Sequence, residues 1–190
     1  TTILKMQEGA SIRAFGPTGI RFTSELSKAD YENLIENNCT FSTLIVPASY
    51  VPEGGITKDN YSDNKYAVKA QAKNSIVVEA DKVTFSGTLV GTEDEKGNFT
   101  DFPSTFYNVP LTAVSYYANA EGTILEFASN PQTYSIAYIA SALQAEGQTD
   151  PYYTAITDSV LFDGFTFGEQ SYSVKAGATL DTTLNSQGLK

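Results

Sequence analysis

The sequence contains no histidine and no tryptophan, and it has one cysteine and one methionine among 190 residues. Without histidine the chain lacks the commonest general base, which excludes serine–histidine–aspartate and cysteine–histidine catalytic centres and most catalytic zinc sites. A single cysteine excludes an intramolecular disulfide, and the strand pattern around Cys39 predicts that this thiol is buried. The sequence also has no P-loop, no dinucleotide-binding fingerprint and no nucleophile elbow. We therefore expect a protein that is not an enzyme.

A glycosidase is the one catalytic alternative that these absences leave open. Such an enzyme needs only two carboxylates, and 22 acidic residues can offer a suitable pair. The absence of tryptophan counts against this alternative, because tryptophan is prominent in the aromatic clefts that hold sugars in these enzymes.

Basic residues are scarce as well. The chain has 12 lysine and arginine residues against 22 acidic ones, a formal net charge of −10 and a pI near 4.4. Nucleic acid and anionic membrane surfaces would repel such a chain, because both are bound mainly through lysine and arginine. No segment approaches the roughly 18 uninterrupted apolar residues of a membrane span. We expect no nucleic-acid partner and no membrane insertion.

The residues that are abundant favour β-structure. Twelve tyrosines and eleven phenylalanines occur together with many β-branched residues and many turn-forming glycines, asparagines and serines. Alternating or continuous apolar segments bounded by turn residues predict ten strands. The predicted strands are 10–15, 19–23, 41–46, 66–70, 75–80, 83–90, 111–118, 123–128, 159–167 and 171–174.

Two segments predict helices. Ser27 can cap a helix that presents Tyr31, Leu34 and Ile35 on one face and ends at 37–38. Thr133 is the expected cap of a second helix, whose apolar face and stop signal are Ile136, Ile139, Ala140, Leu143 and Gly147. The fold class is therefore α+β or mainly β, with β-sandwich-like antiparallel sheets and about two short helices. We expect one globular domain over 1–181 and a polar linker over 182–190.

Tyrosines are the first candidates for ligand contact, because a tyrosine offers a flat apolar face and a hydroxyl group. Two of them lie in a long predicted loop over 48–65, two more form a pair in a predicted loop near residue 150, and one lies on a strand. These candidate ligand-binding residues are Tyr50, Tyr61, Tyr152, Tyr153 and Tyr116.

The only two arginines are the second candidates. Arg13 and Arg21 are both four residues from Pro17, so a hairpin centred on Pro17 would place them directly opposite each other. Like charges in that position are destabilising unless a negative group lies between them. That group is either an acidic side chain, which gives a structural ion pair, or a bound anion such as a uronate.

Two acidic loops are candidates for calcium, a cation that binds carboxylate, amide and carbonyl oxygens. One loop contains Asp59 and Asp63, and the other contains Asp94 and Asp101. Neither fits the EF-hand pattern, and solvated turns are the alternative. We expect no other cofactor.

Six short segments between Gly9 and Leu143 occur in an order that resembles a known type of domain. They are Gly9-Ala10-Ser11-Ile12-Arg13, Pro17-Thr18-Gly19-Ile20-Arg21-Phe22-Thr23, the helix with Tyr31 and Leu34, Phe41-Ser42-Thr43-Leu44-Ile45-Val46-Pro47, Phe85-Ser86-Gly87-Thr88-Leu89-Val90 and Ser135-Ile136-Ala137-Tyr138-Ile139-Ala140. The succession resembles a poorly characterised modular domain of secreted and cell-wall-anchored proteins of anaerobic, gut-type Gram-positive bacteria. Val114 and Tyr134 stand where that domain tends to have arginine.

The resemblance implies a secreted or cell-surface location beside Ig-like, carbohydrate-binding, dockerin or leucine-rich-repeat modules. With the tyrosines, it favours a non-catalytic accessory module that binds polysaccharide. The alternative is a protein-interaction or adhesion module with a host or bacterial surface protein as partner, or a structural spacer.

Overall fold

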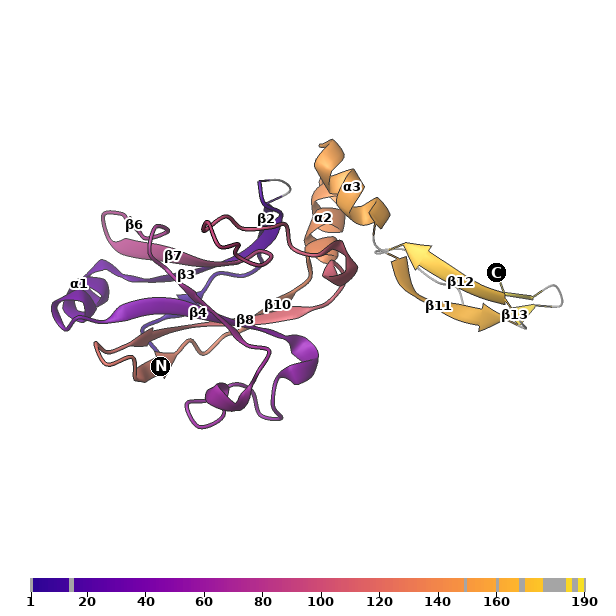
Figure 1. Cartoon of the computed structure of the whole chain (residues 1–190). Coiled ribbons are helices and arrows are strands. Elements are labelled where there is room, and N and C mark those ends of the chain that lie inside the picture. The colour runs from indigo at the N-terminus through magenta and orange to yellow at the C-terminus, as the bar shows by residue number, and fades with distance from the viewer. Residues whose placement is uncertain are drawn as a thin grey trace.

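The computed structural model describes residues 2–13, 16–148, 150–159, 161–167, 170–175, 184–185 and 188–189, with side chains through residue 157. Two antiparallel sheets lie face to face (Figure 1). Sheet A contains β1 (Lys5–Met6), β2 (Ser11–Arg13), β3 (Gly19–Ser27), β6 (Val77–Val78) and β7 (Lys82–Leu89). Sheet B contains β4 (Thr40–Pro47), β5 (Val68–Gln71), β8 (Leu111–Ala118), β9 (Ile124–Phe127) and β10 (Gln132–Tyr134). The predicted fold class is confirmed.

Both sheets are built on the same plan. A pair of long strands forms the centre: β3 with β7 in sheet A, and β4 with β8 in sheet B. Two short strands share the other edge of one long strand, β1 and β2 along β3, and β9 and β10 along β8. A single short strand, β6 or β5, pairs with the remaining long strand.

The main core lies between the sheets and follows from the alternation of side chains along the strands. Phe22 on β3 and Phe85 on β7 are almost completely buried. Phe41 on β4 meets Phe85 with ring centroids 5.3 Å apart. Cys39, as predicted, is buried and is a free thiol. The other face of β4 is also buried, because the long loop over 48–67 packs Ile56 and Tyr61 against the core cluster.

The first helix, α1 (Lys28–Glu36), confirms the predicted cap. The Ser27 hydroxyl accepts a hydrogen bond from the backbone N–H of Asp30 at 3.1 Å. Leu34 is buried, but Ile35 is 44% exposed, so the predicted apolar face was too wide. The helix ends where Asn38 adopts φ 58°, the left-handed conformation that asparagine tolerates.

The second helix, α2 (Ile136–Ala145), begins after Ser135, so the prediction of Thr133 as its cap is wrong. Ser135 Oγ accepts from the backbone N–H of Tyr138 at 3.1 Å. Thr133 lies in β10, where pairing with β8 holds its backbone extended and its hydroxyl lies 2.8 Å from that of Thr112. Gly147, with φ 89°, follows the helix as predicted.

A third helix, α3 (Pro151–Ser159), occupies the segment that was predicted to be a loop with Tyr152 and Tyr153. Asp150 begins it, because its carboxylate accepts from the backbone N–H of Tyr152 at 2.9 Å. Aspartate followed by proline is a typical helix start, since proline fits the first turn where no N–H partner is needed. None of the described helices is long and apolar enough to span a membrane.

The last strands form two hairpins. β11 (Leu161–Phe167) pairs with β12 (Gln170–Lys175), close to the predicted bounds, although Ser159 belongs to α3. β13 (Leu184–Asn185) and β14 (Gly188–Leu189) form a second, very short pair within the segment predicted to be a linker. Whether a domain ends at residue 181 stays a prediction.

Candidate functional site

A groove of about 1050 Å³ lies where the outer face of sheet A meets β5 of sheet B. Outward-facing side chains of β3 and β7 line it in register, with Arg21 opposite Thr88 and Thr23 opposite Ser86. β5, the segment 73–75 and the segment 89–93 with Phe99 complete the lining. The groove therefore combines residues from both sheets along one open surface.

Both arginines lie in this groove, but not directly opposite each other. In the β2–β3 pair, Arg13 is opposite Gly19, and Arg21 is opposite Ser11. The predicted opposition is wrong because the hairpin is centred on Gly16, whose φ of 66° suits the turn, rather than on Pro17. The register differs from the predicted one by two residues, so both side chains remain on the same face of the sheet.

Neither arginine forms an ion pair with a carboxylate among the described residues. Arg13 donates from Nη1 to the backbone carbonyl of Gly16 at 2.9 Å. Arg21 donates from Nε to the Ser11 hydroxyl at 3.0 Å. A structural ion pair of either arginine therefore does not occur within the described part of the chain, and ligand binding by these residues stays a prediction.

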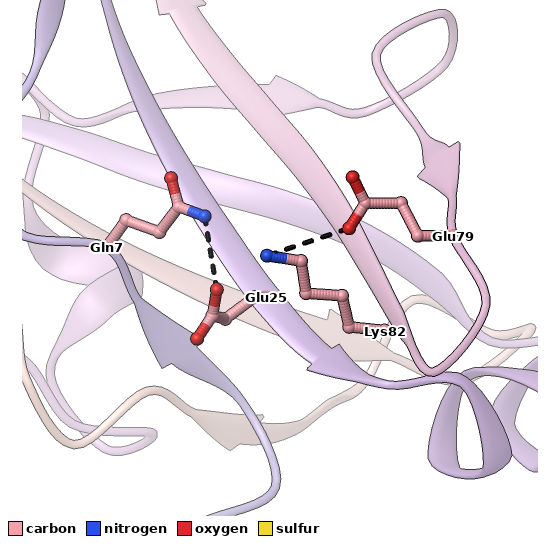
Figure 2. A network of polar contacts seen from close by, with 4 residues as sticks. All are labelled: Gln7, Glu25, Glu79 and Lys82. Carbon is pink, nitrogen blue, oxygen red and sulfur yellow. Dashed lines mark hydrogen bonds and ion pairs between the residues drawn. The ribbon is translucent and has the colours of Figure 1, made fainter.

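The opposite end of the same sheet face is different, as Figure 2 shows. Gln7 donates to the Glu25 carboxylate at 3.1 Å, and the Lys82 ammonium lies 3.6 Å from the Glu79 carboxylate. There the charged groups have protein partners within reach. At the arginine end, Arg13 and Arg21 have no such carboxylate partner among the described residues.

The groove is positively charged in an acidic protein. Its lining contains four basic side chains and one acidic one, Glu93, whereas the whole chain has a net charge of −10. The basic residues are Arg13, Arg21, Lys69 and Lys73. The Lys69 ammonium lies 5.0 Å from the centroid of the Tyr61 ring, so that ring already binds it.

A smaller cleft of about 450 Å³ contains Tyr50 and Tyr66, whose ring centroids are 4.2 Å apart. Both side chains are exposed, by 49% and 43%. A hydrogen bond with the Tyr66 hydroxyl is the main cause that raises the pKa of Tyr50. Polar residues surround the rings: Asn60, Asp63, Asn64 and Lys65. The sequence predicted Tyr50 but placed Tyr66 in a strand, and that strand begins only at Val68.

The other candidate tyrosines are not part of this cleft. Tyr61 is half-buried and Tyr116 is buried, and both pack against Phe127. Burial is the main cause that raises the pKa of Tyr116. Tyr152 and Tyr153 lie on α3, which Figure 1 places away from the loop that holds Tyr50. Of the five predicted tyrosines, only Tyr50 lies in this cleft.

Two of the four candidate calcium ligands, Asp94 and Asp101, accept hydrogen bonds from the backbone. Asp94 accepts from the backbone N–H groups of Asn98 at 2.8 Å and Lys96 at 2.9 Å, and the bonds from Asn98 lower its pKa. Asp101 accepts from the backbone N–H of Thr18 at 2.7 Å. Asp63 lines the tyrosine cleft, and Asp59 is exposed in the same long loop. No group of three metal-ligating side chains occurs within the described residues. Calcium binding stays a prediction.

The chain matches no model of a known protein family. No curated protein sequence matches it either. The geometry of the groove and of the tyrosine cleft is therefore what supports a function.

Proposed function

We propose that this chain is a non-catalytic module that binds carbohydrate through the Tyr50–Tyr66 cleft. The observation that supports this most is the pair of exposed tyrosine rings 4.2 Å apart. An aromatic ring offers a sugar an apolar face against its C–H groups, and the hydroxyl offers a hydrogen bond. The amide and carboxylate groups around the rings can bind sugar hydroxyls.

The backbone on both sides of the cleft is fixed by hydrogen bonds before any ligand arrives. Asn64 donates from Nδ2 to the Tyr50 carbonyl at 2.8 Å, and its Oδ1 accepts from the Tyr66 backbone N–H at 3.2 Å. One side chain thus fixes both ends of the cleft. Rigid contact residues improve affinity because less conformational entropy is lost on binding.

The test is a binding assay of the chain on insoluble and soluble neutral polysaccharides. We expect Tyr50→Ala with Tyr66→Ala to weaken binding about tenfold or more, because the double substitution removes both aromatic surfaces and both hydroxyls of the cleft. Tyr138→Ala is the matched control, since Tyr138 is also exposed and also pairs with a tyrosine, Tyr134, at 5.7 Å. Tyr152→Ala tests the candidate on α3 in the same assay.

Two results would contradict the proposal. One is the absence of binding to plant, microbial and host glycans by the unchanged chain. The other is equal weakening by the control substitution, which would show that the tyrosine cleft is not the contact surface.

A protein-interaction module is the second candidate. Val77 and Val78 on the edge strand β6 are 54% and 51% exposed, and a protein partner that covers them would remove this apolar surface from water. Substituting both by threonine would abolish capture of a protein partner and leave the binding of neutral polysaccharide at the Tyr50–Tyr66 cleft unchanged, because neither valine lines that cleft. A secreted or wall-associated location, which the sequence resemblance implies, suits both candidates.

A further inference from the structure

We infer that the groove over β3 and β7 is a second binding site, independent of the tyrosine cleft, and that its ligand is a polysaccharide of uronate sugars. The chain has two arginines, and both line this groove. An acidic protein repels anions in general, so a local positive surface selects anions only at that place. Lys73 adds a further positive charge to the lining.

Each guanidinium group leaves two neighbouring nitrogen atoms for a carboxylate. Arg13 uses Nη1 on Gly16, which leaves Nε and Nη2 without a partner among the described residues. Arg21 uses Nε on Ser11, which leaves Nη1 and Nη2. Two parallel N–H donors match the two oxygens of one carboxylate in a bidentate pair. The two arginines are diagonal neighbours on paired strands, and the Cα atoms of such neighbours are roughly 7–8 Å apart. The two side chains can therefore bind two carboxylates of the same polysaccharide chain.

The remainder of the groove suits a sugar rather than a simple anion. Hydroxyl groups form a row along its floor on Thr23, Thr84, Ser86 and Thr88. Those of Thr23 and Ser86 lie 3.0 Å apart, and each can still exchange a hydrogen bond with a ligand hydroxyl. Val77 and Phe99 add exposed apolar surface for the C–H groups of a sugar ring. A volume of about 1050 Å³ accommodates several sugar units.

An acidic peptide added as a further strand suits the groove less well. The Ser75 hydroxyl donates to the Ser86 carbonyl at 2.9 Å and accepts from the Ser86 N–H at 3.0 Å. Both backbone groups that β7 would offer a new strand at this position are therefore occupied. The ligand is recognised through side chains instead.

The test uses polygalacturonate as probe and isothermal titration calorimetry of the full chain. We expect Arg13→Gln with Arg21→Gln to weaken binding about tenfold or more and to reduce its salt dependence. Lys5→Gln with Lys58→Gln removes the same charge outside the groove and should leave the affinity unchanged. Arg13→Lys with Arg21→Lys keeps the charge but removes the paired donors, and should also weaken binding. All four positions are exposed, and thermal unfolding monitors the fold.

Tyr50→Ala with Tyr66→Ala should leave polygalacturonate binding unchanged, so failure of the tyrosine cleft and failure of the groove can be told apart. Several results would overturn the inference. They are no binding by the unchanged chain, equal binding of carboxyl-reduced polymer, equal loss in the lysine-to-glutamine control, or full affinity in the arginine-to-lysine variant. Tighter binding of a sulfated glycan or of poly-glutamate would show that the ligand class is wrong.

Discussion

Gly87 on β7 lies directly against Thr43 on β4, so that a Cβ atom added at Gly87 would be 2.4 Å from the Thr43 Cβ. These two residues belong to different sheets, and the sheets approach closely where they meet. Both positions are buried, and neither backbone can move without disturbing a long central strand. Gly87 is therefore required by the distance between the sheets rather than by a turn.

Gly87→Ala should consequently destabilise the protein. The added methyl group overpacks the core, which costs about 1–3 kcal/mol. Urea unfolding of the variant and of the unchanged chain measures the difference. The double variant Thr43→Gly with Gly87→Ala should lose less free energy of unfolding than the two single variants together, because Thr43→Gly removes the atoms with which the new methyl group clashes. Full additivity would show that the two residues do not limit each other.

Thr43→Val should leave the free energy of unfolding unchanged or raise it by about 1 kcal/mol. The Thr43 hydroxyl is buried and has no hydrogen-bond partner among the described residues, as is true of Ser24 and Ser115. Burying an unpaired hydroxyl costs free energy, and valine has nearly the same shape without the polar group. The urea midpoint tests this. A loss of more than about 1 kcal/mol would show that the hydroxyl is satisfied in solution.

Alkaline pH should destabilise the fold through Tyr117. Burial is the main cause that raises its pKa to about 12, and the neighbouring Glu126 contributes in the same direction. Because the folded-state pKa lies above the unfolded value of about 10, the stability contribution is present below pH 10 and is lost as the pH rises towards 12.

Denaturation midpoints measured between pH 9 and pH 12 should therefore fall less steeply for Tyr117→Phe than for the unchanged chain. Below pH 9 the difference between the two proteins should be constant. Parallel curves over the whole range would contradict the raised pKa.

Asp101→Ala should lower the free energy of unfolding by about 1–2 kcal/mol, because the Thr18 N–H loses a charged acceptor at 2.7 Å. This bond joins the loop after β7 to the start of β3. Asp59→Ala is the control, since Asp59 is an exposed acidic residue of the other loop. Thermal unfolding should show a loss for Asp101→Ala alone. Added calcium in the same experiment tests the cation prediction for both loops.

Features that depend on neighbouring residues were predictable from the sequence. The Ser27 cap and the end of α1 at Asn37–Asn38 follow from side chains within one or two turns of each other. The run of strand-forming residues from Phe41 to Val46, closed by Pro47, likewise predicted the buried strand β4. The start of α3 at Asp150–Pro151 was equally local, and it was missed because Tyr152 and Tyr153 suggested an exposed loop.

The candidate sites could be predicted only in part, because they combine residues that are far apart in the sequence or depend on the exact pairing register of two strands. Arg13 and Arg21 share one face of sheet A, as the sequence predicted. The pairing register of their strands is set by the turn at Gly16, and the distance of each arginine from Pro17 in the sequence could not show this register. Tyr66 contacts Tyr50 across a loop of fifteen residues, 51–65, which Asn64 closes through hydrogen bonds. Tyr61 in the long loop packs against Phe127 of the β8–β9 hairpin, a contact between residues far apart in the sequence, whereas Tyr116 is the direct cross-strand partner of Phe127 within that hairpin.

The common plan of the two sheets also bears on how the molecule behaves among its own copies. Each central strand has eight or nine residues, whereas the strands at the sheet margins have two to four. A long, flat margin with unpaired backbone groups acts as a template for another chain and leads to aggregation. Interrupted margins of this length offer little such template in either sheet. Copies of the chain held close together therefore have little tendency to pair through the edges of these two sheets.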